Sequence, residues 1–273
     1  MQYKIYRFDK ICIFGERKLN YDCRMALKIT HIEQTDSTNA YLQRLQATTD
    51  ICGCVVVASK QTAGKGMGRN TWESAEGQNL TFSIAFDMSF LPAAMQFQLS
   101  KAVPLGILKA LDEIIPEKHF EIKWPNDIYC ENHKIGGILI NSTIKGTMMD
   151  VSIIGVGLNV NQLKFKDWPT NPASLRNLTG KTYDSKSLLH SICQHLEEER
   201  EKLKHCCEEN DFSAINEDYL NHLFRYHAWA EYEIAGSRKR LFMENVDTFG
   251  RLQLSDKSGK SSVFDIKEIK FII

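Results

Sequence analysis

The sequence lacks the features that would place it in several large classes of protein. Lys and Arg total 34 among the 273 residues, and Asp and Glu also total 34, so the formal net charge is zero. That balance argues against a general nucleic-acid or membrane-surface role, although it is compatible with a local basic patch. No apolar run approaches the roughly 20 residues of a spanning helix. Ile11–Phe14 is too short for a signal peptide. We therefore predict neither a nucleic-acid nor a membrane partner.

The eight cysteines follow neither a metal-binding nor a redox spacing. None belongs to a Cys-x-x-Cys pair, which argues against a zinc ribbon and against thioredoxin chemistry. Scattered thiols without a pairing pattern are typical of proteins in a reducing compartment. We therefore predict a cytoplasmic protein with reduced, buried cysteines.

The segment Gln61–Trp72, which reads Q-T-A-G-K-G-M-G-R-N-T-W, is rich in glycine and basic residues and follows an apolar run at 55–57. Glycines leave backbone N–H groups open to a ligand, and Lys65 and Arg69 add positive charge, so the segment suits a phosphate or another anion. Its spacing fits neither a Walker A loop nor the dinucleotide fingerprint, because Arg69 stands where the latter needs glycine. Taken alone, the segment is equally compatible with a plain surface loop.

Four further motifs accompany this segment in a fixed order. They read T-D-S-T-N at 35–39, K-W-P-N-D at 123–127, K-I-G-G-I-L at 134–139 and G-V-G-L-N at 155–159. Each motif alone is modestly specific, but the ordered set resembles the biotin–protein ligase family (biotin–acetyl-CoA-carboxylase ligases). The resemblance is good over about 27–161 and loose over the remainder. It is to the form without an N-terminal DNA-binding domain, because about 25 residues precede the core.

The resemblance implies an ATP-dependent ligase that transfers biotin to a lysine of a biotin carboxyl carrier protein domain. Such an enzyme first makes biotinyl-5'-adenylate, so ATP and Mg²⁺ are the expected cofactors. Activation gathers negative charge on one phosphorus, for which fixed cations and backbone N–H donors are the expected catalysts. Edge strands of the sheet could dock the carrier domain, and the same surface could form a homodimer.

The resemblance assigns biotin to short polar side chains and to the glycine-rich segments. The matching residues are Ser37, Thr38, Asn39, Gln61, Lys65, Gly66, Met67, Lys134 and Gly137. Ser37 could also cap a helix, and the two roles can coexist. The family pattern has arginine at the position of Lys65 and commonly at that of Met67, which weakens the expected hold on the adenylate. Arg69 is our candidate to take over the anion contact.

A second group of residues matches positions for the nucleotide and for catalysis. The nucleotide positions are Lys65, Arg69, Trp72, Asn126, Lys134 and Asn159, and the catalytic ones are Lys134, Asp127 and Lys123. Lys134 would reduce the repulsion between the biotin carboxylate and the α-phosphate. Asp127 would orient the incoming amine or help to hold Mg²⁺, which prefers oxygen ligands. Simpler interpretations stay open, namely a surface cation for Lys123 and an anchor of the loop base for Trp72. Asn159 could be a strand-end turn residue.

Hydrophobic patterning predicts an α+β fold. Apolar and polar residues alternate from Leu80 to Phe86, which predicts a strand with one core face. Helical spacing from Leu99 to Ile114 follows Pro92, a residue suited to open a helix. Pro104 inside this helix should kink or divide it.

The second half of the chain predicts further helices and then short strands. Residues 161–182 are polar and predict a loop, after which Asp184 can cap a helix. The charge run Glu197–Lys202 in that helix is expected on a solvated face. A second helix is predicted near 212–224, and beyond it about five short strands alternate with turns.

We therefore divide the chain into three parts. Residues 1–24 form a short N-terminal extension, 25–224 a catalytic domain that binds biotin and ATP, and 225–273 a small SH3-like β-barrel. The resemblance implies the same architecture, a class II synthetase-like mixed sheet with helices (the biotin–lipoate ligase fold) followed by the barrel.

Three other functions are weighed against this interpretation. A lipoate–protein ligase or octanoyl transferase belongs to the same superfamily, but its arginine- and glycine-rich signature is absent here. A DNA-bound regulator would need a longer N-terminal segment. A non-catalytic biotin-binding regulator that keeps the fold but not the turnover is the third.

Overall fold

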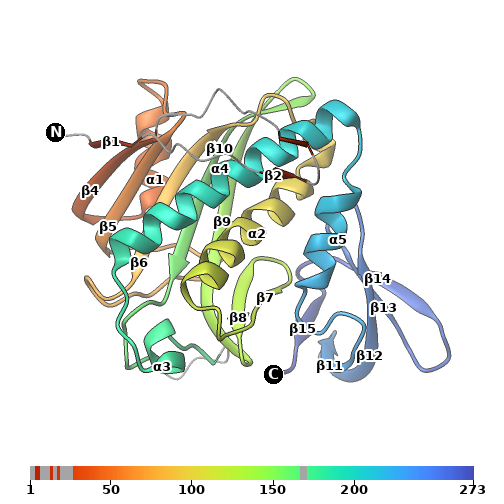
Figure 1. Ribbon diagram of the computed structural model, residues 1–273. Coiled ribbons are helices and arrows are strands. Elements are labelled where there is room, and N and C mark those ends of the chain that lie inside the picture. Colours follow the sequence, from red (N-terminus) through yellow and green to blue (C-terminus); the bar gives the residue numbers. More distant parts are fainter. Residues whose placement is uncertain (1–3, 7–12, 15–16, 19–26, 167–170) are drawn as a thin grey trace.

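The computed structural model describes residues 4–6, 13–14, 17–18, 27–166 and 171–273 (Figure 1). Most of the predicted N-terminal extension therefore lies outside the described residues. The larger sheet has eight strands in the order β1-β4-β5-β6-β10-β9-β8-β7. Its strands are β1 (Lys4–Tyr6), β4 (Leu27–Thr35), β5 (Cys54–Gln61), β6 (Leu80–Asp87), β7 (Phe120–Lys123), β8 (Asp127–Cys130), β9 (His133–Lys145) and β10 (Met148–Leu158).

The sheet is mixed, as predicted. The pair β4–β5 is parallel, with α1 (Thr38–Gln46) in the crossover between the two strands. The neighbouring pairs β5–β6, β6–β10 and β10–β9 are antiparallel. A separate two-stranded sheet joins β2 (Ile13–Phe14) to β3 (Arg17–Lys18).

Both faces of the sheet are covered at its centre. Val55, Ile84 and Ile154 belong to the large core under the long helices, whereas their chain neighbours Val56, Ala85 and Ile153 form a smaller core with Leu42 of α1. Successive residues of a strand point to opposite faces, so these two cores lie on opposite sides of the sheet. The prediction that Leu80–Phe86 has a single core face was wrong, because α1 buries the second face as well.

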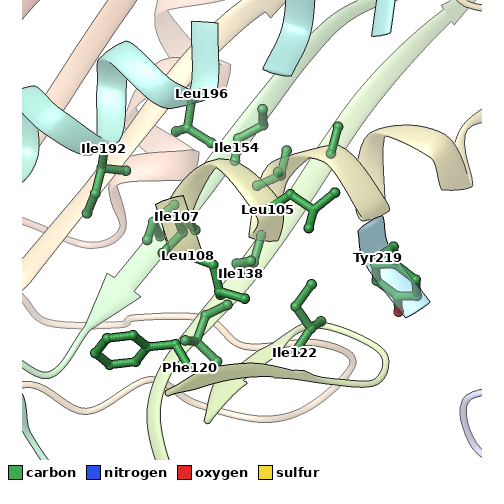
Figure 2. Packing of buried hydrophobic residues seen from close by; sticks show 14 of the residues in the cluster. Leu105, Ile107, Leu108, Phe120, Ile122, Ile138, Ile154, Ile192, Leu196 and Tyr219 are labelled. Atoms are coloured by element: carbon green, nitrogen blue, oxygen red, sulfur yellow. The ribbon is translucent and has the colours of Figure 1, made fainter. Parts of the chain in front are cut away.

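The long helices α2 (Phe97–Ile114) and α4 (Ser185–Glu209) lie side by side across the larger core (Figure 1). Figure 2 shows Leu105 and Leu108 of α2 between Ile192 and Leu196 of α4 and Ile138 of the sheet. Pro104 lies inside α2 without dividing it, which corrects the expectation of a split helix. Packing on several sides offsets the roughly 3 kcal/mol that a proline costs in a helix interior. A short 3₁₀ helix, η1 (Ala93–Met95), follows Pro92.

The charge run in α4 is not a solvated face. Glu197, Glu199 and Arg200 are all buried, and Glu199 pairs with Lys109 of α2 at 2.5 Å. Arg200 donates to the carbonyl of Asp87 at 3.0 Å and lies over the Phe86 ring. Each charge tolerates burial because it has a partner. A charge pattern along one helix cannot reveal partners on other elements.

Two shorter helices complete the main domain. Helix α3 (Leu175–Thr179) begins at a Ser174–Asn177 capping box and falls inside the segment predicted as a loop, which is a correction. The Asp184 cap of α4 is confirmed, since its side chain accepts from the backbone N–H of Ser187. The predicted second helix is α5 (Ser213–Asn221). Within the described ranges, no helix is long and apolar enough to cross a membrane.

The chain ends in an antiparallel sheet of five strands (the smaller sheet), as predicted for the SH3-like part. Its order is β14-β13-β12-β11-β15, and its strands are β11 (Trp229–Ile234), β12 (Ser237–Val246), β13 (Leu252–Ser255), β14 (Ser261–Phe264) and β15 (Ile269–Phe271). The segment joining the two sheets lies along β7, where Ile122 donates to His222 and accepts from Phe224. That edge of the larger sheet is therefore partly covered by the chain itself.

Lys101 of α2 is buried where α2 meets α5. Its Nζ donates to Asn216 Oδ1 at 2.7 Å and lies 5.7 Å from the centre of the Tyr219 ring. Burial lowers the pKa of Lys101 from its ordinary 10.5 to about 8, partly opposed by the charge of Asp247. As the pH rises, Lys101 therefore loses its proton at a lower pH in the folded state than in the unfolded state.

We expect Lys101→Met to stabilise the protein by about 2 kcal/mol at pH 7. At this pH the wild type must bury a charged amine, and the variant does not. Stability of the wild type should rise relative to the variant between about pH 8 and 10.5. Urea unfolding of both proteins at pH 7 and 9.5 measures this gap. Lys257→Met, at an exposed lysine in the turn between β13 and β14, is the control. An equal gap at the two pH values would contradict the assignment.

Candidate ligand-binding and catalytic site

A cavity of about 440 Å³ lies over the larger sheet and is bounded by the start of α1, the glycine-rich segment and the smaller sheet. Most of the predicted site residues line it: Ser37, Thr38, Asn39, Gln61, Lys65, Gly66, Met67, Trp72, Lys123, Asn126, Asp127, Lys134 and Gly137. All of the predicted biotin residues are in this set. The folded chain thus brings together motifs that are far apart in the sequence.

A second, open groove of about 940 Å³ adjoins the first cavity. Arg69 and Asn159, two of the predicted nucleotide residues, line this groove and not the cavity. Trp72 and Lys134 line both spaces, so these two side chains lie where the cavity and the groove meet. Lys164 and Lys166 add further positive charge to the groove.

The start of α1 forms the polar end of the cavity. The backbone N–H of Thr38 donates to Gln61 Oε1 at 2.7 Å, and the Ser83 hydroxyl lies 2.6 Å from Thr38 Oγ1. Ser37 stands at the N-cap position of α1, but its side chain makes no capping hydrogen bond. The capping interpretation of the Ser37 hydroxyl is therefore wrong.

Asp36 organises the helix start from outside the cavity. Its carboxylate accepts from the backbone N–H of Ser37 at 2.8 Å and forms a two-pronged pair with Arg44. The Arg44 hydrogen bond and the Ser37 N–H hold the pKa of Asp36 well below its usual range. The Asp36 carboxylate thus accepts a hydrogen bond at the start of the helix, where the Ser37 hydroxyl makes no capping bond.

Asn39 is almost fully occupied by hydrogen bonds within the protein. Its Nδ2 donates to the Leu139 carbonyl at 3.0 Å and to Asn141 Oδ1 at 2.8 Å, and its Oδ1 accepts from the buried Ser83 hydroxyl at 2.5 Å. Gly155 makes room for this amide, since a Cβ there would lie 2.3 Å from Asn39 Oδ1. Asn39 therefore ties α1 to β9 and shapes the cavity wall.

Glycine is also required where Trp72 lies against the sheet. A Cβ on Gly157 would come within 2.3 Å of the indole ring, and one on Gly137 would lie 3.4 Å from it. These two glycines pair across β9 and β10 and leave a flat surface for an aromatic ring. The indole Nε1 is buried and finds no hydrogen-bond partner among the described residues. Trp72 is thus part of the wall between the two spaces, and more than an anchor of the loop.

Lys134 and Asp127 form the charged centre of the cavity. Their Nζ and Oδ1 atoms are 2.6 Å apart, and both side chains are mostly buried. The β8–β9 pairing shifts register between Ile128 and Tyr129, which places Lys134 opposite Tyr129 while Asp127 pairs with Gly137. Asn126, in the connection between β7 and β8, holds that connection against β9 by donating to the Ile138 carbonyl at 2.6 Å.

Lys123 is not an ordinary surface cation. Its Nζ lies 5.1 Å from the centre of the Tyr129 ring and 5.0 Å from that of Phe271, on the cavity wall. Burial lowers the pKa of Lys123, and the nearby Asp127 carboxylate opposes the shift. The amine therefore releases its proton more readily than an exposed lysine does.

Sequence reasoning missed two groups of site residues. Ser83 is fully buried and holds both Thr38 and Asn39. The C-terminal segment supplies further cavity walls through Ile266, Ile269, Lys270, Phe271 and Ile273. Neither group could be found from a local pattern. Ser83 is one polar residue of an alternating strand, and the C-terminal residues lie more than 100 residues from the other motifs.

The described residues contain no cluster of metal-ligating side chains. No group of three or more His, Cys, Asp or Glu side chains in the described part of the chain could hold an ion. Asp127 is the one Asp or Glu side chain of that part that lines the cavity, and it already pairs with Lys134. Asp127 therefore belongs to no cluster of acidic, His or Cys side chains in the described residues that would support its predicted metal role.

The fold is shared with solved structures of biotin protein ligases. The structure overlays on the biotin protein ligase from Aquifex aeolicus in complex with biotin and ATP with a TM-score of 0.71 and 24% sequence identity, covering 89% of this chain and 97% of that one. A Leishmania major ligase in complex with biotinyl-5-AMP overlays with a TM-score of 0.61, 22% identity and coverage of 87% and 98%. The chain thus has the fold of the biotin protein ligases.

Sequence comparison agrees with the fold. Residues 31–159, slightly less than half of the chain, match the model of the Biotin/lipoate A/B protein ligase family. The biotin–[acetyl-CoA-carboxylase] ligase of Mycobacterium tuberculosis is 33% identical over 134 residues, 48% of each chain. Biotin–protein ligase 1 of Arabidopsis thaliana is 34% identical over 129 residues, 43% of this chain and 35% of the relative. The matched segment thus spans half or less of these relatives.

Proposed function

We propose that this chain is an ATP-dependent ligase that activates biotin as biotinyl-5'-adenylate and transfers it to a lysine of a biotin carboxyl carrier domain. The observation that carries the proposal is the position of Lys134 between the cavity of the biotin residues and the groove of Arg69 and Asn159. The names of the Mycobacterium and Arabidopsis relatives support the same substrates, as do the biotin and ATP held in the Aquifex complex.

The chemistry follows from this placement. In the first step a biotin carboxylate oxygen attacks the α-phosphorus of ATP, and the bond to the leaving pyrophosphate breaks. The Lys134 ammonium, held by Asp127, neutralises charge on both reacting groups at the junction. In the second step the acceptor amine attacks the acyl carbon, AMP leaves with the bonding electrons, and an amide forms. Asp127 is placed to orient that amine and accept its proton.

ATP is proposed to lie in the groove with its α-phosphate toward Lys134. The groove walls carry Arg69, Lys164 and Lys166, the last paired with Glu73 at 2.9 Å. Such cations suit a triphosphate. Because the described residues offer no ligand cage, we propose that Mg²⁺ enters as the complex with ATP, held mainly by phosphate oxygens and water.

Direct observation of the intermediate tests the function. The protein is incubated with ATP, Mg²⁺ and biotin, and the bound fraction is analysed by mass spectrometry for biotinyl-adenylate. A parallel reaction replaces biotin with lipoate, and a third adds a carrier domain. We expect adenylate formation and carrier labelling in the reactions with biotin, and neither in the reaction with lipoate. Labelling with lipoate would move the assignment to the lipoate branch of the family, and biotin binding without adenylate would indicate a non-catalytic binder.

Arg69→Ala is expected to release biotinyl-adenylate about tenfold faster, because a guanidinium facing the phosphate supplies charge-assisted hydrogen bonds. The measurement is the release of preformed labelled adenylate from the protein into solution. Arg240→Ala, at an exposed position of β12, is the control. An unchanged release rate would exclude Arg69 from the phosphate site and leave Lys65 as the loop cation.

The carrier domain, a homodimer and a cytoplasmic location are parts of the same proposal. Both protein contacts would use exposed strand edges, as in other cases of strand addition. The β7 edge is partly covered by residues 222–224, so it offers fewer free backbone groups than an open edge does. Sedimentation of the protein with and without biotin and ATP measures the oligomeric state.

A further inference from the structure

The turn between β12 and β13, residues 247–251, is fitted closely onto the main domain. Gly250 has a φ of +86°, and a Cβ there would lie 2.3 Å from Cδ2 of Phe97 at the start of α2. Both the left-handed backbone and the close approach require glycine. The turn therefore packs with its backbone directly on α2.

The same turn holds the indole of Trp124. Trp124 Nε1 donates to the Gly250 carbonyl at 2.9 Å, and the Trp124 side chain is 2% exposed. A buried N–H and a buried carbonyl both need a partner, so this bond fixes the indole relative to the turn. Phe271 of β15 packs on the indole as well, with ring centres 6.5 Å apart. The smaller sheet thus contacts Trp124 through two of its elements.

Hydrogen bonds within the turn hold its conformation. The Asp247 carboxylate accepts from the backbone N–H groups of Phe249 and Arg251, each at 2.9 Å, and from Arg251 Nε at 2.7 Å. These bonds present the Gly250 carbonyl in a defined direction. None of these three residues lines the cavity.

Trp124 in turn belongs to the segment that carries the charged centre. It lies between Lys123 and Asn126 in the connection from β7 to β8, and all three residues line the cavity. Asn126 fastens one side of this connection to β9, and Trp124 fastens the other side to the 247–251 turn. Asp127 follows directly and holds Lys134.

We propose that the 247–251 turn is a positioning element for the reaction, acting through Trp124 on the Asp127–Lys134 pair. This inference rests on the proposed function. It gives the smaller sheet a role in the activation step that is separate from contact with the carrier domain. Trp124 is a positioning residue, because its indole N–H is used by the turn and not by a substrate.

Trp124→Phe keeps an aromatic ring and removes the N–H. We expect the rate constant of adenylate formation per active site to fall about tenfold, since a small displacement of a catalytic pair is costly. The biotin KM should stay within about twofold, because the polar end of the cavity at α1 is untouched. Rapid-quench measurements give both the rate constant and the amplitude, which counts active sites.

A merely structural role for Trp124 predicts a different result. In that case the amplitude falls with the folded fraction while the rate constant per site is unchanged, and this outcome would overturn the proposal. Trp229→Phe makes the same chemical change at an exposed tryptophan of β11 and should alter neither quantity. If the wild type formed no adenylate, the proposed function would fail, and that result is distinct from an unchanged rate in Trp124→Phe.

A second variant addresses the turn itself without touching the cavity. Asp247→Ala removes the acceptor that braces the turn, so we expect a smaller fall in the rate constant, about threefold, with the amplitude retained. The combination with Trp124→Phe should be no slower than Trp124→Phe alone, because both act on one contact. Additive losses would show that the turn does not act through Trp124.

Discussion

Lys134→Ala is expected to lower the rate of biotinyl-adenylate formation by about three orders of magnitude, the size of effect seen when a preorganised charge is removed from a transition state. Lys134 lies at the junction of the two spaces and is the one residue predicted for biotin, nucleotide and catalysis alike. Its removal also leaves Asp127 without its partner at 2.6 Å. Biotin-dependent exchange of pyrophosphate into ATP measures the loss.

The fold should survive this substitution, because Lys134 and Asp127 keep some contact with solvent. Lys118→Ala is a matched control, since Lys118 forms an equally short pair with Glu131 outside both spaces. It should exchange pyrophosphate at the normal rate. Near-normal exchange in Lys134→Ala would remove Lys134 from the activation step, and thermal unfolding of both variants separates catalysis from stability.

Gly155→Ala is expected to raise the biotin KM by about two orders of magnitude, because a small displacement of a binding group has large effects. The added Cβ would lie 2.3 Å from Asn39 Oδ1. Asn39 cannot easily yield, because its amide is held by Leu139, Asn141 and Ser83. The start of α1, which carries Ser37 and Thr38, must therefore shift. Initial rates of adenylate formation at varied biotin concentration give the KM.

A double variant tests the physical reason. If Gly155→Ala acts through Asn39, its effect and that of Asn39→Ala on the biotin KM should not add in the combined variant. Gly146→Ala is the control, because Gly146 has open space around it in the β9–β10 hairpin and reports backbone strain alone. A Gly155→Ala protein with an unchanged biotin KM would show that α1 does not set the biotin pocket.

Short motifs made most of the candidate site predictable. Lys134, Asp127 and Trp72 each belong to a contiguous motif, and these motifs meet in one cavity because they occupy neighbouring strands and the loop above them. The five strands of the smaller sheet were predictable for a similar reason, since turn residues separate short alternating runs. Local patterns of this kind need no knowledge of distant contacts.

Other features depended on contacts that no local pattern records. Glu199 and Arg200 belong to a charge run that predicts a solvated face, yet both are buried against partners on α2 and β6. Ser83 belongs to the strand face predicted to be exposed, yet α1 covers it. The Gly250 carbonyl meets Trp124 across more than 120 residues of chain.

The residues alone predicted an α+β protein with a glycine-rich, basic segment that suits an anion, and the resemblance of the ordered motifs to a ligase family added the prediction of a lysine for carboxylate activation. The first two predictions follow from side-chain chemistry and short-range periodicity, which do not depend on where the segments lie in the fold. Tertiary structure decided that two spaces meet at Lys134 and Trp72, that Asn39 serves the scaffold, and that the smaller sheet braces Trp124. These outcomes depend on which distant groups satisfy one another's hydrogen bonds and charges once water is excluded.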